Sequence, residues 1–167
     1  MLKQSFTYQL ASISEDAIKP AAKLFGRRFG LDVQELRVLR LVGDQPGVNF
    51  TTLAAQTRFE RSATSRILSR LIKSGLIRRE LDEHDARQFR LFITDKGIEL
   101  RRQADPLSLA LENLILSALT PKERQQFRQA LDKLSDWLAH EFLGELTRRY
   151  PDSGGKQPAR GKKGQPS

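Results

Sequence analysis

The chain has 167 residues, of which 38% are hydrophobic, and a formal net charge of +9. This length and apolar content suffice for one compact domain or two closely joined ones, and the positive charge favours an anionic partner, with nucleic acid as the best candidate. The absence of cysteine excludes disulfides, thiolate catalysis and thiol-based oxidant sensing. No apolar run approaches the roughly 20 residues that span a bilayer, and residues 1–10 lack a signal-peptide core, so we expect a cytoplasmic protein.

Two helices are predicted before residue 49. The first is N-terminal, and Pro20 interrupts it. Its apolar residues follow helical spacing and are Leu10, Ile13, Ala17, Ala21, Leu24 and Phe25. The second begins at a capping box formed by Asp32 and Glu35 and stops near residues 43–47. Its apolar side carries Leu36, Leu39 and Val42.

The stretch from Phe50 to Gly97 has the order of a winged helix-turn-helix, with short helices, the last of them basic, followed by a hairpin. Asn49 caps a helix whose apolar positions are Phe50, Leu53 and Ala54. Gly75 ends the next helix, because glycine accepts positive φ at low cost. That helix has an apolar side with Ile67, Leu68, Leu71 and Ile72, and an opposite side with Ser62, Ser65, Arg66, Arg70 and Lys73.

Two strand-like runs follow this helix, at residues 76–81 and 90–94. The charged loop between them is too long for a two-residue turn, so we interpret the pair as a wing. Residues 58–80 contain seven Arg or Lys against two acids. Positive charge is therefore concentrated where a duplex would dock, and phosphate neutralisation with counterion release supplies much of the affinity of such surfaces.

The segment from Gly30 to Gly97, roughly two-fifths of the chain, resembles the MarR family of bacterial transcriptional regulators. The resemblance rests on the order and spacing of Phe29-Gly30-Leu31, Leu53-Ala54, Ser62-Ala63-Thr64-Ser65-Arg66, Leu71 to Ile77, Asp85-Ala86-Arg87 and Leu91 to Gly97. It implies a dimer formed by terminal helices of two subunits. Two-fold symmetry then implies a pseudo-palindromic operator with half-sites about one helical turn apart.

The chain departs from the family pattern at two places. Glu60-Arg61 stands where the family commonly has a small polar residue followed by proline. Thr57 and Glu60 fit a capping box, which would start the recognition helix a turn earlier than the resemblance implies. In the wing, Ala86 occupies a position that is often arginine, so one wing contact would be missing.

We expect DNA contacts from the polar side of the recognition helix and from the wing. Arg70 and Lys73 are assigned to phosphates, because they lie further from the helix N-terminus that enters the groove. Asp85 is expected to orient Arg87 toward the minor groove, with local pairing of the two as the alternative. The predicted DNA-binding residues are Arg61, Ser62, Ala63, Ser65, Arg66, Arg70, Lys73, Asp85 and Arg87, and a merely solvated helix face is the alternative.

Two further helices are predicted after the wing. Thr94 or Asp95 caps the first, and Pro106 inside it predicts a kink or a break. Thr120, Pro121 and Glu123 form the best helix start in the chain. Apolar positions are Ile98, Leu107, Leu111, Leu114 and Ile115 in the first, and Phe127, Leu131, Leu134, Leu138 and Phe142 in the second. Trp137 is expected in the core or an interface.

The terminal stripes need a partner surface, either each other within one chain or a second copy. The family resemblance favours a homodimer, with Leu10, Ile13, Leu131, Leu134, Leu138 and Phe142 in the interface. Residues 151–167 contain four Gly, three Pro and four Lys or Arg, and no large apolar residue. We expect a disordered basic tail that either has no function or adds phosphate contacts.

A small-molecule effector is a further implication of the family resemblance. MarR-like proteins commonly bind small aromatic or anionic compounds in a crevice between the dimerisation and DNA-binding parts. The residues expected to line such a crevice are Phe25, Phe29, Arg37 and Arg40. The alternative is a simple polar helix face, in which Arg40 pairs with Asp44 at i and i+4.

The sequence does not predict an enzyme, a cofactor or a metal site. It lacks a Gly-rich phosphate loop and any Ser-His-Asp or paired-carboxylate motif in a recognisable context. His84 and His140 form no metal-ligand cluster and are expected at the surface, where His84 would modulate DNA affinity with pH.

We therefore predict a mainly α-helical fold with a small β-hairpin wing. Its parts are an N-terminal dimerisation helix (1–30), a winged helix-turn-helix (31–97), C-terminal dimerisation helices (98–150) and a basic tail (151–167). The predicted function is sequence-specific binding of double-stranded DNA by a homodimeric regulator, a repressor more often than an activator in such families, released by a small aromatic or anionic ligand. The alternatives are an architectural DNA-binding protein with little sequence preference and no effector, and a winged-helix protein-interaction module.

Overall fold

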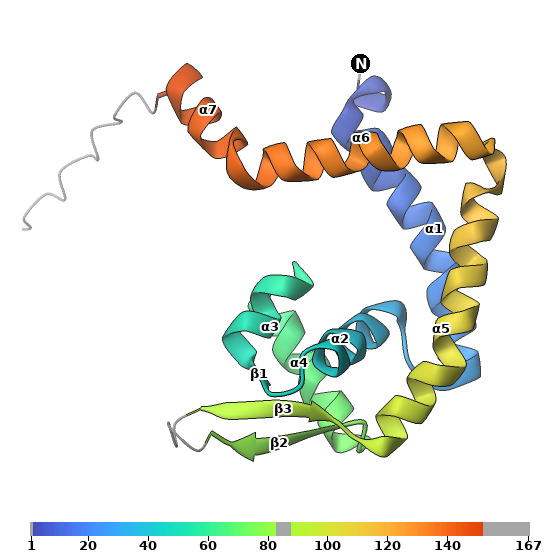
Figure 1. Ribbon diagram of the computed structural model, residues 1–167, viewed down its shortest axis with the longest axis vertical. Helices are drawn as coiled ribbons and strands as arrows, with labels where there is room; N and C mark the ends of the chain where they lie inside the picture. The colour runs from blue at the N-terminus through green and yellow to red at the C-terminus, as the bar shows by residue number, and fades with distance from the viewer. Residues whose placement is uncertain (1, 83–87, 152–167) are drawn as a thin grey trace, which may run out of the picture. The chain divides into compact units, whose positions relative to one another are not determined.

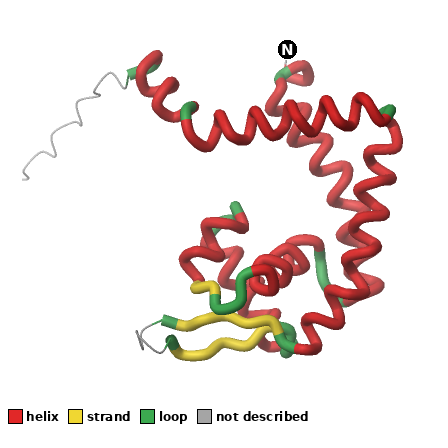
Figure 2. The backbone as a smooth tube through the Cα atoms, viewed as in Figure 1, coloured by secondary structure: helices red, strands yellow, loops and turns green. Residues whose placement is uncertain are grey.

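A computed structural model describes residues 2–82 and 88–151 of the chain (Figure 1). The structure is mostly helical, with one small three-stranded antiparallel sheet (Figure 2). This confirms the predicted fold class. The chain divides into two compact units, Met1–Ser117 and Ala118–Ser167.

The first unit contains the helix-turn-helix and the wing. Its helices are η1 (Leu2–Gln4), α1 (Phe6–Phe29), α2 (Val33–Asp44), α3 (Phe50–Thr57), α4 (Arg61–Lys73) and α5 (Asp95–Ile115), and its strands are β1 (Val48–Asn49), β2 (Ile77–Leu81) and β3 (Phe89–Ile93). The strand order is β1-β3-β2. Strands β2 and β3 pair from Ile77 opposite Ile93 to Leu81 opposite Phe89, and both lie within one residue of the predicted limits.

Side-chain caps start α2, α3 and α5 of this unit as predicted. The Asp32 carboxylate accepts a hydrogen bond from the Glu35 N–H at 2.8 Å, and the Glu35 carboxylate accepts one from the Asp32 N–H at 2.9 Å, which completes the capping box of α2. Asn49 Oδ1 accepts a backbone N–H at 2.9 Å at the start of α3, and Thr94 Oγ1 accepts one at 3.2 Å at the start of α5. Each cap satisfies an N–H that the first turn leaves without a helical partner.

The core of the first unit lies between α2, α4 and the base of the wing. Its fully or nearly fully buried side chains include Leu36, Val38, Leu39, Val42, Leu53, Ile67, Leu71, Ile77 and Leu91. The apolar sides predicted for α2 and α4 are therefore buried, with Ile72 packed at the edge of the core. Burying one such side chain stabilises the fold by about 1.5–3 kcal/mol. Burial of this cluster is therefore the main contribution that holds α4 against α2.

Neither internal proline interrupts its helix. Helix α1 continues through Pro20 and α5 continues through Pro106, so of the kink or break predicted at Pro106 the break is wrong. The two helices contact each other, and this packing offsets the backbone hydrogen bond that each proline removes. The chain leaves α5 instead at a short 3-10 turn, η2 (Leu116–Ala118), at the boundary between the units.

In its described residues, the second unit contains α6 (Pro121–His140) and α7 (Phe142–Arg149). Thr120 and Glu123 form the predicted capping box, and the Thr120 N–H and hydroxyl hold the pKa of the Glu123 carboxyl below its ordinary value. Phe142 begins α7, so the stripe predicted for one helix belongs to two, and its ring packs 5.2 Å from that of Trp137. The α6 side chains Phe127, Leu131, Leu134 and Leu138 stay exposed in the single chain.

Candidate nucleic-acid interface

Helix α4 presents the polar and basic side that was predicted for a recognition helix. Its opposite side is in the core, where Thr64, Ile67, Leu68 and Leu71 are buried. The exposed side carries Arg61, Ser62, Ser65, Arg66, Ser69, Arg70 and Lys73, with Ala63 half-buried. The fold therefore brings the predicted DNA-binding residues of this helix together, while the predicted wing contacts Asp85 and Arg87 lie outside the described residues.

Helix α4 begins at Arg61, so the earlier start predicted from a Thr57 capping box is wrong. Thr57 is the last residue of α3. Its hydroxyl donates to the Ala54 carbonyl at 3.0 Å and lies 3.0 Å from the Thr64 hydroxyl, and both threonines are buried. Because the Thr57 hydroxyl is needed to satisfy this buried polar pair, it is not available as a cap. The pair joins α3 to α4 inside the helix-turn-helix.

The turn between α3 and α4 holds Arg58 in the left-handed backbone region, at φ 56°. A residue with a Cβ adopts this conformation at a cost of roughly 1–2 kcal/mol. The next residue, Phe59, packs beside the core, and the Arg37 guanidinium of α2 lies 5.2 Å from the centre of its ring. The short turn and these contacts fix the direction in which α4 leaves α3.

Arg70 is engaged by α2. Its Nε lies 2.9 Å from the Glu35 carboxylate, which is largely buried, whereas the Arg70 side chain is largely exposed. Arg70 was predicted to contact DNA phosphates from its place on the helix, and its pairing with Glu35 was not predicted. The two residues are far apart in the sequence, and no local pattern joins them.

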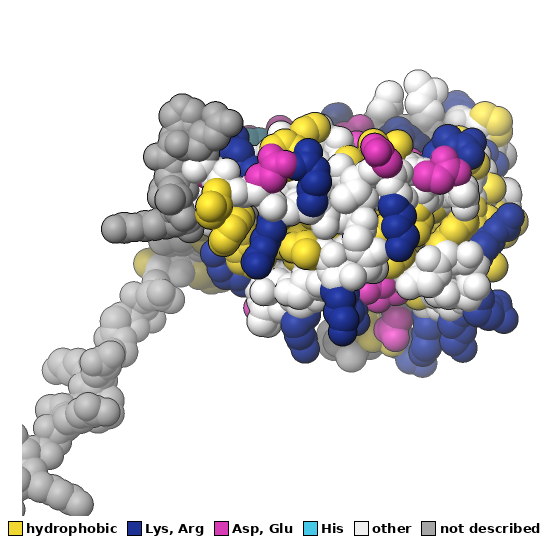
Figure 3. Space-filling model, turned by 90° about the horizontal axis from the view of Figure 1, so that it is seen from below, with side chains coloured by type: hydrophobic (Ala, Val, Ile, Leu, Met, Phe, Trp, Pro, Cys, Tyr) yellow, Lys and Arg dark blue, Asp and Glu magenta, His cyan; other side chains and the backbone are white. Residues whose placement is uncertain are grey.

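The wing strands carry guanidinium groups stacked on phenylalanine rings. Arg78 lies over Phe92 at 4.6 Å and Arg79 over Phe89 at 4.9 Å, measured to the ring centres. Arg78 also pairs with Glu80. Figure 3 shows Lys and Arg side chains across the face seen from below, with exposed apolar side chains between them. Stacking holds the charges at defined positions and leaves the N–H edge of the Arg79 guanidinium for other partners.

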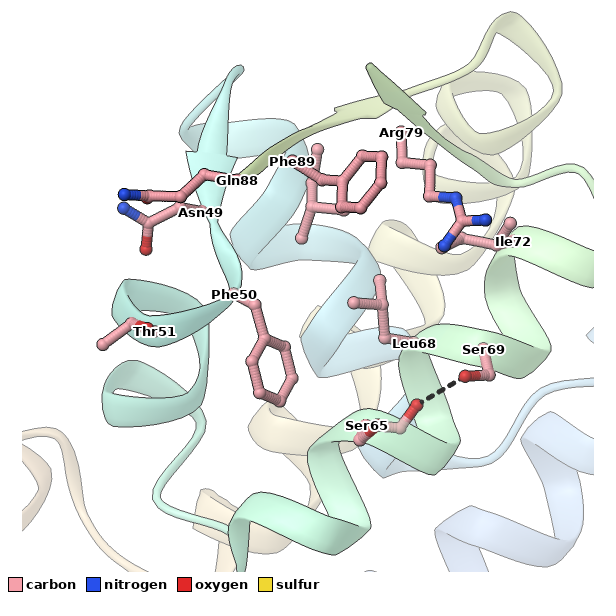
Figure 4. Close-up of a pocket in the computed structure, with 11 residues that line it drawn as sticks. Asn49, Phe50, Thr51, Ser65, Leu68, Ser69, Ile72, Arg79, Gln88 and Phe89 are labelled. Carbon is pink, nitrogen blue, oxygen red and sulfur yellow. Dashed lines mark hydrogen bonds between the residues drawn. The ribbon is translucent and has the colours of Figure 1, made fainter. Parts of the chain in front are cut away.

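A groove of about 610 Å³ lies between α3, α4 and the wing strands. Its apolar lining includes Phe50, Leu68, Ile72 and Phe89. Figure 4 shows Asn49 and Gln88 together at one end, Arg79 beside Ile72 at the other, and Ser65 and Ser69 along α4. This groove was not predicted from the sequence, because it forms only when residues from three segments of the chain come together.

A smaller crevice of about 270 Å³ lies between α1, α2 and α5. Phe25, Arg37 and Arg40 of the predicted ligand-binding set line it, and Phe29 does not, although its ring is 5.5 Å from that of Phe25. Arg40 donates to the Asp105 carboxylate at 2.7 Å and to the Ser108 hydroxyl at 2.6 Å, both on α5.

The predicted pair of Arg40 with Asp44 is wrong. Asp44 pairs instead with Arg101 of α5, at 2.9 Å. Arg40 and Asp44 therefore each pair with a residue of α5 and not with each other. The packing of α2 on α5 brings Asp105 to Arg40 and Arg101 to Asp44.

The described residues show no other obvious functional centre. Within residues 2–82 and 88–151, no group of three or more His, Cys, Asp or Glu is arranged to hold a metal ion. None of the helices in this part of the chain has both the length and the hydropathy needed to cross a bilayer. His140 is exposed on α6, as predicted, with its Nδ1 2.9 Å from the Asp136 carbonyl oxygen, and His84 lies outside the described residues.

The chain is similar to known regulators in sequence and in fold. A model described as MarR family matches residues 29–88. The HTH-type transcriptional regulator BilQ of Clostridium symbiosum is 28% identical over 133 residues, which cover 80% of this chain and 92% of BilQ. An HTH-type transcriptional repressor of Mycobacterium bovis is 26% identical over 105 residues, 63% of this chain and 76% of that protein. The crystal structure of an S. aureus MepR–DNA complex superposes with a TM-score of 0.71 at 22% identity, over 79% of this chain and 97% of MepR.

Proposed function

Because the chain belongs to the MarR family of DNA-binding transcriptional regulators, we propose that it is a repressor that binds a pseudo-palindromic operator as a homodimer. The observation that carries this proposal is the exposed polar and basic side of α4 beside a wing. The name of the M. bovis relative supports the repressor role, and the MepR complex is a DNA-bound example of the same fold.

The proposed base contacts come from the first turns of α4. Ser62, Ser65 and Arg66 are exposed there, and short hydroxyls with a guanidinium suit the donor and acceptor pattern of the major groove. Arg61, Ala63 and Lys73 lie along the sugar-phosphate backbone in this arrangement. Arg87, oriented by Asp85, enters the minor groove.

The proposed homodimer is formed by the terminal helices. In the single chain, Leu10 and Ile13 of α1 are exposed, as are Leu131, Leu134, Leu138 and Phe142 of α6 and α7. Apolar side chains of this size gain about 1.5–3 kcal/mol each when they leave water, so a second copy that covers them stabilises the chain. A two-fold dimer presents two copies of α4, which is the reason for a palindromic operator.

The proposed effector is a small aromatic anion that occupies the crevice between α1, α2 and α5. Arg37 and Arg40 supply positive charge beside the Phe25 ring. A ligand carboxylate competes with Asp105 for Arg40 and attracts Arg37, which also stacks on Phe59 in the turn before α4. The ligand thereby favours a different placement of α4 and lowers its affinity for DNA. Benzoate should release wild-type protein from its operator but should not release Arg37→Gln.

A selection of genomic fragments with the purified protein tests the proposed function. The expected result is enrichment of fragments that share an inverted repeat with half-sites about one helical turn apart. Enrichment without a shared sequence would instead support the architectural DNA-binding alternative. No enrichment above a protein-free control would contradict DNA binding itself.

A further inference from the structure

The groove between α4 and the wing contains polar groups that the proposed DNA contacts do not use. Its lining of Leu68, Ile72 and the rings of Phe50 and Phe89 is apolar, and its polar ends are Arg79 and Asn49 (Figure 4). No Asp or Glu side chain is among the described residues that line it. The groove therefore suits an anionic ligand that also has an apolar surface.

The geometry of a duplex indicates what this ligand is. The major and minor grooves of B-DNA are separated by one sugar-phosphate strand. If α4 enters the major groove and the wing enters the neighbouring minor groove, that strand passes between the helix and the wing. In this chain, the space between them is the groove. A sugar-phosphate strand has the required chemistry, because each phosphate is an anion and each deoxyribose has an apolar face.

Arg79 is arranged to meet a phosphate at one end of the groove. Its guanidinium lies 4.9 Å from the centre of the Phe89 ring, which holds the side chain in place before DNA arrives. An arginine side chain has roughly 2 kcal/mol of rotamer entropy, so this stacking lowers the cost of ordering it on DNA. The N–H groups at the edge of a stacked guanidinium still donate in its plane.

Asn49 is arranged to donate at the other end. Its Oδ1 accepts the Thr52 N–H at 2.9 Å as the cap of α3, so the orientation of the amide is set by the backbone. The amide NH₂ then points away from that bond. An amide has two donors, and phosphate oxygens accept them.

We propose that this groove holds the sugar-phosphate strand between the two DNA grooves, with Arg79 and the Asn49 amide as phosphate contacts and the Phe89 and Leu68 side chains against deoxyribose. This inference rests on the proposed function, because it requires both α4 and the wing to bind one duplex. It assigns DNA contacts to two residues outside the recognition helix and outside the wing tip.

The first test compares Arg79→Ala with Arg78→Ala. Arg78 is the neighbouring residue of the same strand, but its guanidinium stacks on Phe92, pairs with Glu80 and does not line the groove. Arg79→Ala should weaken binding to operator and random duplex alike, by roughly ten-fold, and should make the slope of log affinity against log salt shallower by about 0.9. Arg78→Ala should change both quantities much less. Equal effects of the two substitutions would overturn the role of Arg79.

The second test is Asn49→Asp, which separates capping from DNA binding. Aspartate caps a helix as well as asparagine does, so the melting temperature should stay unchanged. The donor is replaced by an anionic oxygen, so affinity for any duplex should fall by about ten-fold or more. Unchanged affinity would show that Asn49 does not face a phosphate.

The outcomes distinguish this inference from the proposed function. If wild type and Arg78→Ala bind DNA and the Arg79 and Asn49 variants bind equally well, the strand placement is wrong and the DNA-binding function stands. If wild type binds no duplex at low salt, the proposed function fails and this inference fails with it.

Discussion

Arg70 of α4 is held by the carboxylate that also caps α2. Its Nε lies 2.9 Å from Glu35 Oε1, while Glu35 Oε2 accepts the Asp32 N–H at 2.9 Å. The Glu35 side chain is 11% exposed and that of Arg70 is 61% exposed. A mostly buried carboxylate depends on its partner more than an exposed guanidinium does. Glu35 therefore links the start of α2 to the third turn of α4.

A double-mutant cycle of Arg70→Ala and Glu35→Gln should show this link. Arg70→Ala leaves a mostly buried carboxylate without its partner and should lower the free energy of unfolding by about 1 kcal/mol, a value reduced by the exposure of Arg70. The coupling energy should be several tenths of a kcal/mol or more in urea titrations at one protein concentration. Lys73→Ala is the control, because the described residues show no ion pair for Lys73. A coupling energy of zero would mean that Arg70 and Glu35 lie close together but that their pairing does not stabilise the fold.

Local patterns predicted the starts of α2, α3, α5 and α6, and the structure shows why. The capping boxes at Asp32 and Thr120 and the cap at Asn49 each involve residues within three positions of each other. Their formation depends on the backbone of one turn, so sequence spacing determines it. The apolar sides of α2 and α4 follow from helical spacing in the same way.

Contacts between distant segments were not predictable from the sequence. Arg40 was expected to pair with Asp44 in its own helix, but the packing of α2 on α5 brings it to Asp105. Thr57 fitted a cap, but the approach of α3 and α4 buries its hydroxyl against Thr64. In both cases several local partners were chemically possible, and tertiary packing determined which contact formed.

Arg58→Gly should stabilise the fold. Arg58 has φ 56°, a conformation that glycine adopts without the steric cost of a Cβ. The larger freedom of glycine in the unfolded chain offsets part of this gain, so the expected increase in the free energy of unfolding is roughly 0.5–1 kcal/mol. Arg58→Ala removes the same side chain but keeps the Cβ, so thermal unfolding should show no increase for that control. If the free energy of unfolding rises equally in both variants, loss of the Arg58 side chain is the cause and relief of the backbone conformation is not.

Arg66→Ala should remove sequence discrimination while the fold stays intact. Arg66 is exposed on α4 beside Ser62 and Ser65, and truncating an exposed side chain leaves the core unchanged. Loss of one base contact should cost roughly 1–3 kcal/mol on the preferred site and much less on random duplex. Fluorescence anisotropy on both duplexes measures the difference. Equal losses on the two would assign Arg66 to a phosphate instead.

Leu134→Asp together with Leu138→Asp should dissociate the proposed homodimer. Both leucines lie on the exposed apolar side of α6, and two carboxylates in an apolar contact would lose their hydration without gaining partners. Sedimentation or light scattering should report a mass near 19.0 kDa for the variant, or aggregation, and twice that monomer mass for wild type. DNA affinity should fall as well, because a monomer contacts only one half-site.

Gln125→Asp together with Gln129→Asp is the matched control. These residues are exposed on the opposite side of α6, so the variant carries the same two new carboxylates on the same helix without entering the proposed contact. It should keep the dimer mass and the DNA affinity of wild type, apart from a small loss that added negative charge causes at low salt. Circular dichroism should show the same helix content for both variants. If the Leu134→Asp, Leu138→Asp variant keeps its helix content and still has twice the monomer mass, the dimer interface lies away from this side of α6.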